Sequence, residues 1–189
     1  SIGLQGPGID AFADEDLRYL ALQQDILIRG LPEQSVRVEM RDSAYVYDVR
    51  AGELVSHEPT STWDTTISRG TPRLFALLPY RVTGLSTEVR RIAGPADAPE
   101  DFVRNPDAAA SIAPGQTVQL GVRVSAAVRE PGFHVVHLSV FAPGSDREHR
   151  EYSRNIDCPA GAGTVVIPFA LNDPDGIWRL VFTDAATGV

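Results

Sequence analysis

The stretch SVRVEM, residues 35–40, places an apolar side chain at every second position. Val36, Val38 and Met40 would lie on one face of an extended strand, with Arg37 and Glu39 on the other. Further strand-like runs follow at short intervals, with Gly and Pro turns between them: AYVYDV (44–49), RAGELV (50–55), TWDTTIS (62–68) and RLFALLPYRV (73–82). We expect a compact antiparallel unit here, with Pro79 at a strand end because proline cannot donate to a sheet ladder.

The second half of the chain has the same rhythm of short strands and turns. Its runs are IAPGQTVQLGVRVSAA (112–127), FHVVHLSVFAP (133–143), EYSRNIDCP (151–159), GTVVIPFAL (163–171) and IWRLVFTDAA (177–186). Short alternating strands need a second sheet to cover their apolar faces, so this rhythm is typical of an all-β sandwich. Residues 94–110, rich in Pro, Asp and Ala, are expected to form the longest loop.

The N-terminal region is the one place where a helix is expected. Residues 1–13 are rich in Gly and Pro and indicate a linker or opening loop. Asp14 is a possible helix cap, followed by Leu17, Leu20 and Ala21 on one helical face, although the alternation of Leu17, Tyr19 and Ala21 would also suit a strand. The expected fold is mainly β: two antiparallel, immunoglobulin-like β-sandwich units with one short N-terminal helix, over residues 14–84 and 85–189.

Composition excludes several classes of function. The net charge is −8, and all 17 basic residues are arginine, so a sequence-independent nucleic-acid surface is not expected. No apolar run reaches the length of a membrane-spanning helix. Cys158 is the single cysteine, which rules out an intramolecular disulfide and favours a buried structural thiol over a nucleophile.

Two segments resemble accessory modules of large bacterial proteins. VYDVRAGELV with WDTTISRGTPRLFALLP (46–79) resembles the small β-sandwich that follows the catalytic barrel in many glycoside hydrolases, through a D-x-R-x-G hairpin and a G-x-x-R-L-F-A-L strand. Residues 137–188 resemble immunoglobulin-like modules of bacterial surface or carbohydrate-active proteins, through a Y-S-R-N strand and a final D-P-x-G-x-W-x-L segment. The catalytic barrel itself has no counterpart in this chain, so the resemblance implies an accessory role and an extracytoplasmic location.

The residues that could take part in catalysis do not form a recognisable catalytic pattern. Of His57, His134, His137 and His149, the pair in FHVVH lies three apart on an expected strand, which puts the two rings on opposite faces and opposes a shared metal. The acids gather in loops, no G-x-S-x-G elbow occurs, and the glycines at 161–163 indicate a hairpin turn between strands. We therefore assign no catalytic, cofactor-binding or metal-binding residues and expect no cofactor and no enzyme activity.

Aromatic side chains are the more plausible functional feature. Tyr45, Tyr47 and Trp63 in the first unit are candidates for stacking on sugar rings, with a place in the core as the alternative. In the second unit Trp178 alternates with Leu180 and Phe182, which favours burial.

The acids of LNDPDG (171–176) admit two readings. They resemble the start of a calcium loop, but no bidentate Glu follows, and the Pro and Gly suit a turn before the last strand. We prefer the turn, within a final hairpin.

The sequence thus predicts a non-catalytic β-sandwich segment that supports or spaces other domains of the same, larger polypeptide. A carbohydrate-binding module using the three aromatics and a protein-interaction or adhesion module are the alternatives.

Overall fold

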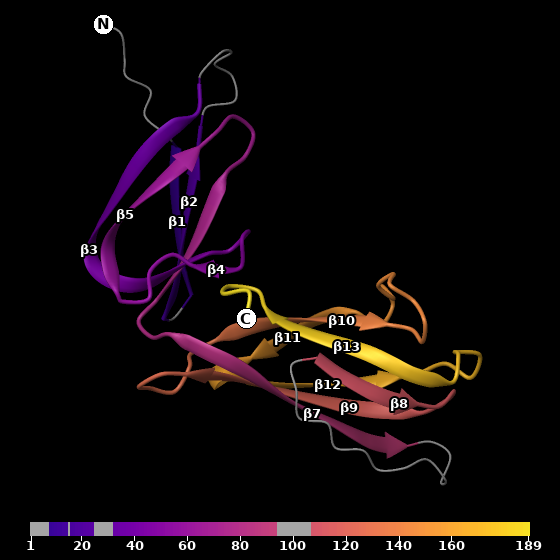
Figure 1. Ribbon diagram of the computed structural model, residues 1–189. Coiled ribbons are helices and arrows are strands. Elements are labelled where there is room, and N and C mark those ends of the chain that lie inside the picture. The colour runs from indigo at the N-terminus through magenta and orange to yellow at the C-terminus, as the bar shows by residue number, and fades with distance from the viewer. Residues whose placement is uncertain (1–7, 15, 25–31, 94–106) are drawn as a thin grey trace, which may run out of the picture. The chain divides into compact units, whose positions relative to one another are not determined.

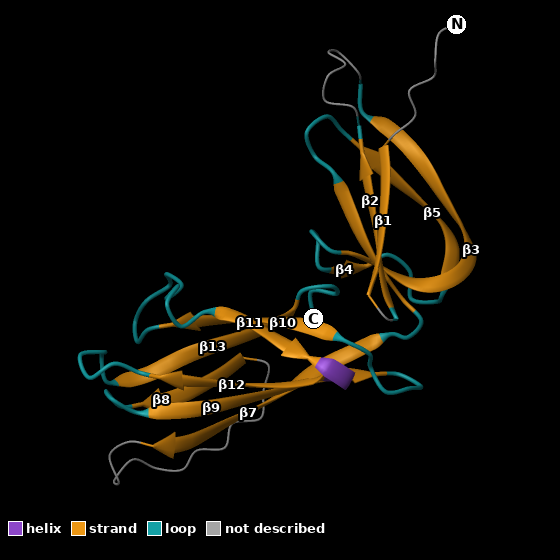
Figure 2. Cartoon of the chain, turned by 180° about the vertical axis from the view of Figure 1, so that it is seen from behind, coloured by secondary structure: helices purple, strands orange, loops and turns teal. Residues whose placement is uncertain are grey.

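A computed structural model describes residues 8–14, 16–24, 32–93 and 107–189 (Figure 1). The chain divides into two compact units, residues 1–81 with 186–188 and residues 82–185 with 189. The described elements are antiparallel strands, apart from the short 3-10 turn η1 (Pro159–Gly161), so the expectation of a mainly β fold is confirmed (Figure 2). No helix in these residues is long and apolar enough to cross a membrane.

The first unit is built on a sheet whose strand order is β1-β2-β6-β3-β4. The strands are β1 (Gly8–Asp14), β2 (Leu17–Gln23), β3 (Gln34–Asp48), β4 (Glu53–Leu54), β5 (Thr60–Ile67) and β6 (Arg73–Leu78). β6 ends one residue before Pro79, as expected from the missing proline donor.

SVRVEM and AYVYDV, expected as separate strands, form one long strand that changes partner along its length. The first part of β3 pairs with β5 from Gln34 to Glu39, and the last part pairs with β6 from Tyr45 to Asp48. The register shifts between Glu39 and Ala44, and such irregularities let a strand bend. The bend brings the β3–β5 ribbon into contact with the main sheet around a core made of Leu22, Val38, Ala44, Val46, Trp63, Ile67, Phe75 and Leu77.

The prediction of an N-terminal helix is wrong for the residues that the structure describes. Residues 17–23 form β2, which pairs with β1 on one side and β6 on the other. Pairing on both edges, with Leu17 and Leu22 buried, outweighs a helical propensity that is only a weak preference. Residues 8–13 of the expected opening loop, together with the expected helix cap Asp14, form β1, while residues 1–7 lie outside the described part.

The D-x-R-x-G motif of the first unit is a structural device. One oxygen of Asp48, Oδ1, accepts hydrogen bonds from the backbone N–H groups of Arg50 and Ala51, and Gly52 takes a left-handed φ of 66° in the turn. The other oxygen, Oδ2, lies 2.8 Å from Nη2 of Arg73, in the R-L-F-A-L strand. The two halves of the motif therefore meet across β3 and β6, where Asp48 pairs with Phe75.

The second unit has two antiparallel sheets, which form the two layers of a sandwich (Figures 1 and 2). The four-stranded sheet has the order β11-β10-β13-β8 and the three-stranded sheet the order β12-β9-β7. The strands are β7 (Val82–Ala93), β8 (Asp107–Ile112), β9 (Thr117–Ala126), β10 (His134–Phe141), β11 (Arg154–Cys158), β12 (Ala162–Pro168) and β13 (Gly176–Asp184).

Burial alternates along the central strands of both sheets. In β9 the buried side chains are Val118, Leu120, Val122 and Val124, and in β13 they include Trp178, Leu180 and Phe182, as the sequence predicted for the last strand. Alternation of this kind buries one face of each sheet away from water and leaves the other face exposed to solvent.

Three expected connections differ from the structure. β8 occupies residues 107–112, part of the expected long loop, whereas residues 94–106 lie outside the described part. The turns at 159–161 and 169–175 do not close hairpins, because β12 lies in a different sheet from both β11 and β13.

The strand order also departs from that of immunoglobulin constant domains. In those domains the first two strands share a sheet, whereas here β7 and β8 lie in different sheets.

We predict that Asp48→Ala lowers the free energy of unfolding by about 2–3 kcal/mol, because it removes two turn hydrogen bonds and leaves Arg73 half-buried without its carboxylate. Glu39→Ala is the matched control: it breaks the Arg37–Glu39 pair, whose side chains are 63% and 73% exposed, and should change stability by less than about 0.5 kcal/mol. Urea unfolding of both variants measures this, and equal effects would contradict the structural role of the motif.

Candidate functional site

The aromatic residues predicted to stack on sugars lie mainly in the core of the first unit. Tyr47 is 2% exposed and Trp63 is 7% exposed, while Tyr45 is half-buried. Trp63 packs edge-on against Phe75, with ring centroids 5.3 Å apart. Trp63 belongs to the core cluster of the first unit, whereas Tyr47 is buried outside that cluster, and neither has an open ring face.

The two histidines of FHVVH lie on opposite faces of β10, as predicted. His134 is fully buried, and its Nδ1 lies 2.9 Å from Oδ1 of Asp184, also fully buried. The ring of His137 is on the solvent side, 2.8 Å from Oδ1 of Asn155 and 3.4 Å from Oε1 of Glu148. Hydrogen bonds from the Ser153 and Ser139 side chains, with a smaller contribution from His137, lower the pKa of Glu148.

Cys158 lies opposite His134 in the β10–β11 ladder and is fully buried. Burial raises the pKa of its thiol from 9.0 to about 11, with a further contribution from the Asp184 carboxylate. A thiol of this kind is neutral at physiological pH and poorly nucleophilic. The expectation of a buried structural thiol is confirmed.

The acids of NDPDG belong to a loop that is fastened by an aromatic cluster. Asp173 Oδ2 accepts hydrogen bonds from the Tyr152 hydroxyl and from the backbone N–H of Ala170. The Tyr152 ring stacks on His149 with centroids 4.4 Å apart, and Phe169 and Trp178 complete the cluster. Loss of water at the phenol and the adjacent Asp173 raise the pKa of Tyr152.

This geometry favours the turn over the calcium site at 171–176. A carboxylate oxygen that accepts one hydrogen bond from its own loop and one from Tyr152 is engaged in holding the loop in place. Within the described residues, no three His, Cys, Asp or Glu side chains gather as a metal site would require.

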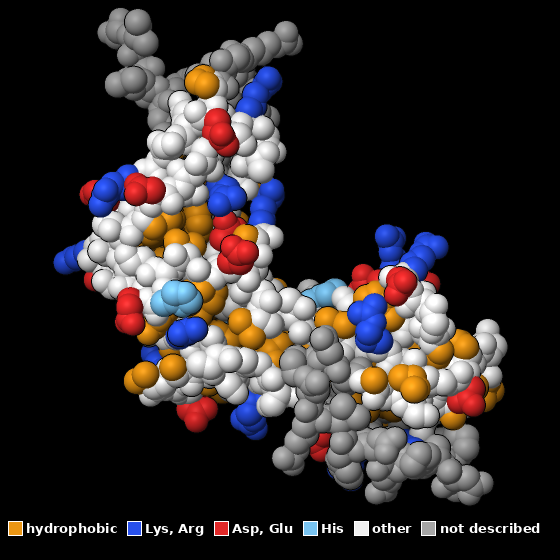
Figure 3. All heavy atoms as spheres, viewed as in Figure 1, with side chains coloured by type: hydrophobic (Ala, Val, Ile, Leu, Met, Phe, Trp, Pro, Cys, Tyr) orange, Lys and Arg blue, Asp and Glu red, His pale blue; other side chains and the backbone are white. Residues whose placement is uncertain are grey.

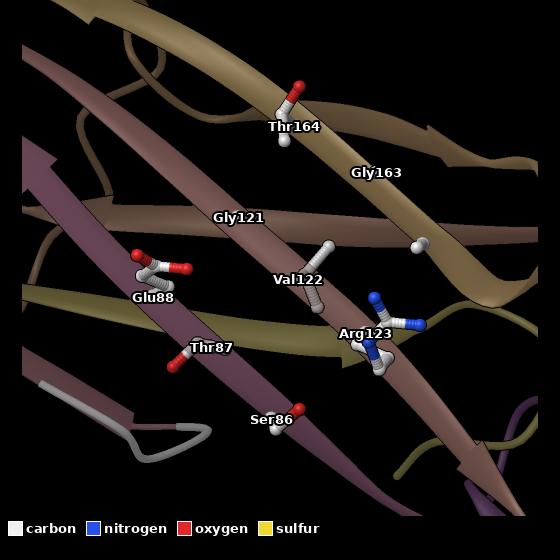
Figure 4. Close-up of a pocket in the computed structure, with 9 residues that line it drawn as sticks. Ser86, Thr87, Glu88, Gly121, Val122, Arg123, Gly163 and Thr164 are labelled. Atoms are coloured by element: carbon white, nitrogen blue, oxygen red, sulfur yellow. The ribbon is translucent and has the colours of Figure 1, made fainter.

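The candidate site that the structure adds is a polar depression on the outer face of the β7–β9–β12 sheet. It has a volume of about 460 Å³ and lies around Gly121, with residues 86–88, 121–123 and 162–164 along its lining. Glu88, Gly121 and Thr164 pair in one row across the three strands (Figure 4). A smaller depression of about 150 Å³ adjoins it and adds Arg90 and Gln119. We call the two together the Gly121 hollow.

Two glycines of the hollow have different reasons to be glycine. A Cβ on Gly163 would lie 2.4 Å from the carbonyl oxygen of Asp157 and 2.8 Å from Sγ of Cys158, so the packing of β12 requires its absence. A Cβ on Gly121 would meet only Glu88 at 3.7 Å or more and Thr164 at 4.0 Å, which are ordinary contacts. The fold accepts a side chain at position 121, and the sequence omits one.

Sequence reasoning missed the hollow. The available signal was a glycine that interrupts the alternating strand TVQLGVRVSA, since glycine inside a strand often marks close approach of a ligand or another backbone. Position 121 lies on the solvent face of that strand, where polar residues are expected and therefore do not indicate a site. The residues around it, Ser86, Glu88, Arg123 and Thr164, come from three strands that only the sheet brings together.

An apolar groove of about 550 Å³ lies in the first unit, along β1, β2 and the first part of β3. Its lining includes Leu20, Val36 and Met40, which pack on the core, and Phe12, which is 63% exposed. Figure 3 shows apolar side chains between charged ones on the visible face of this unit.

Comparison with known proteins gives little guidance. No family model matches the chain, and no curated protein matches it. A solved isomalto-dextranase from Arthrobacter globiformis T6, in complex with panose, is similar at 13% identity and a TM-score of 0.26, over 88% of this chain and 34% of that structure. The chain thus spans about a third of that structure. A likeness this weak leaves both fold and function to be argued from the residues of the chain itself.

The Tyr152–Asp173 contact makes one prediction about stability. Tyr152→Phe should lower the free energy of unfolding by about 1–2 kcal/mol, because it removes the hydroxyl and leaves the Asp173 carboxylate one donor short. Tyr45→Phe, in the first unit, is the matched control and should change stability by less than about 0.5 kcal/mol. Thermal unfolding measures both, and an Asp173→Asn background should shrink the Tyr152 effect if the two side chains act together.

Cys158 makes a prediction about pH. Because the folded state keeps the thiol proton up to about pH 11 and the unfolded state releases it near 9.0, stability should fall as the pH rises through this window. The loss attributable to the thiol is on the order of 2 kcal/mol between about pH 8 and pH 10.5. Urea midpoints at both pH values should drop further in the natural chain than in Cys158→Ala, and parallel drops would contradict the assignment.

Proposed function

We propose that this chain is a non-catalytic β-sandwich segment that supports or spaces other domains of a larger, extracytoplasmic bacterial protein of the carbohydrate-active or surface class. One observation carries the proposal: among the described residues, the histidine–carboxylate pair with the shortest contact is sealed inside the fold. His134 and Asp184 form the arrangement most like a catalytic dyad, and both are 0% exposed. A dyad that no substrate reaches stabilises the sandwich and does not turn over a substrate.

The resemblance in residues 46–79 supports the same role. Its distinctive residues, Asp48 and Arg73, tie a turn to a neighbouring strand. Residues that fasten a turn keep a small sandwich rigid, which is what a supporting module requires.

The apolar groove of the first unit also supports an accessory role. Exposed apolar surface bordered by charged residues is typical of surfaces that bury against another protein. Here Phe12 is exposed beside Arg18 and Arg37. A neighbouring domain of the same polypeptide is the occupant that the supporting role implies.

The alternative of sugar stacking on the first-unit aromatics has less support, since Tyr47 and Trp63 are buried. The other alternative is a protein-interaction module. If the bound partner is a neighbouring domain of the same polypeptide, this alternative is the same as the proposed supporting role.

The test is a search for hydrolysis. The purified chain, incubated with a panel of aryl glycosides and polysaccharides, should release no chromophore and no reducing ends above the buffer rate. Glu88→Gln is the control, because Glu88 is the exposed acid of the Gly121 hollow and its amide should leave the fold intact. Turnover by the natural chain that disappears in Glu88→Gln would overturn the non-catalytic assignment.

A further inference from the structure

We propose that the Gly121 hollow binds an acidic oligosaccharide, a polyhydroxylated ligand that carries carboxylates. The inference goes beyond the supporting role and adds a ligand to it. It rests on three features of the β7–β9–β12 face: a glycine that the fold does not need, a lining of polar groups, and a local excess of positive charge.

The glycine indicates that something approaches the sheet. Glycine in the interior of a strand weakens it, because the unfolded chain has more freedom to lose and no side chain packs. Gly121 is in the central strand of its sheet, it has no left-handed φ, and a Cβ there meets no close neighbour. Glycine at position 121 therefore lowers the stability of the strand, and no close neighbour requires it. A ligand bound in the space above Gly121 would explain why a side chain is absent there.

The lining selects a hydroxylated ligand. Glu88 offers acceptors, Arg90 and Arg123 offer donors, and Ser86, Thr164 and Gln119 offer both. On this face the apolar side chains beside the hollow are small: Ala162 is in its lining, and Val166 is the next outward-facing residue after Thr164 on β12. Val122 is also in the lining, but its side chain is buried on the core side, and no aromatic ring is among the lining residues. Interfaces with proteins are anchored by aromatic and large apolar side chains, so this lining fits a sugar better than a protein.

The charges select an acidic sugar. Arg90 and Arg123 are exposed on either side of Glu88, so this face carries more positive than negative charge in a chain whose net charge is −8. A guanidinium group matches a carboxylate with two parallel hydrogen bonds, while Glu88 accepts hydrogen bonds from sugar hydroxyls. Arg90 pairs with Gln119, four residues before Arg123 on β9, so the two guanidinium groups suit carboxylates on sugar units that are not adjacent in one oligosaccharide.

Titration calorimetry of the whole chain with hexamers of galacturonate, guluronate and neutral glucose tests the site. At least one acidic hexamer should bind at least about tenfold more tightly than the neutral hexamer. The affinity should fall as salt is added, because exposed charge pairs are screened. Arg123→Ala should weaken acidic binding by about tenfold or more.

Gly121→Val separates a functional glycine from a structural one. It should abolish binding while the thermal midpoint stays the same or rises, because valine is favoured in strands and the site has room for it. Gly84→Val is the matched control: Gly84 lies in β7 of the same sheet, also without close neighbours, and pairs with Ser125 outside the hollow. It should leave binding unchanged.

Several outcomes would overturn the inference. They are the absence of saturable binding to both acidic hexamers at millimolar concentration, equal binding of the neutral hexamer, or a loss of thermal stability confined to Gly121→Val. Self-association that Gly121→Val abolishes would assign the face to a protein interface instead. Cleavage of a bound hexamer would contradict the non-catalytic role and leave the binding site standing, so the two proposals fail separately.

Discussion

The rule that every second side chain of a strand must leave water governs both units of this protein. In the second unit β9, β10 and β13 alternate buried and open positions along most of their length. A sheet with one dry face is stable only when a second layer covers it, and that need pairs the four-stranded sheet with the three-stranded one. In the first unit the same need is met by bending one long strand, β3, so that its own first half joins the covering layer.

The rule also decides where chemistry is possible. On the dry face of the second unit His134 is matched with Asp184, since an unmatched group of this kind would be costly there. Side chains on the solvent face can form hydrogen bonds with water, so they need no partner within the protein. The Gly121 hollow lies on an opposite face, which is why its charged groups remain available while more reactive-looking residues do not.

Sequence reasoning succeeded where a property depends on neighbours along the chain. Alternation placed His134 and His137 on opposite faces of one strand, and it placed Trp178 in the core. It failed where the outcome depends on distant partners: residues 17–23 form a strand because β1 and β6 lie beside them, and no local signal shows that. Gly and Pro marked the turns at 159–161 and 169–175, but a turn signal does not show whether the next strand stays in the same sheet. The hollow was missed for the same reason, because its row of Glu88, Gly121 and Thr164 exists only after three strands pair.

The sealed position of Cys158 has a practical consequence. It is the only sulfhydryl of the chain, and it is fully enclosed by the β10–β11 ladder and by β12. A maleimide dye added to the folded protein therefore has no accessible target until one is engineered. A single cysteine introduced on the solvent side of either unit would become a unique attachment point for a fluorophore or spin label, with no need to remove the natural residue. The fold thus leaves the exposed positions of the described residues available to spectroscopy, one chosen position at a time.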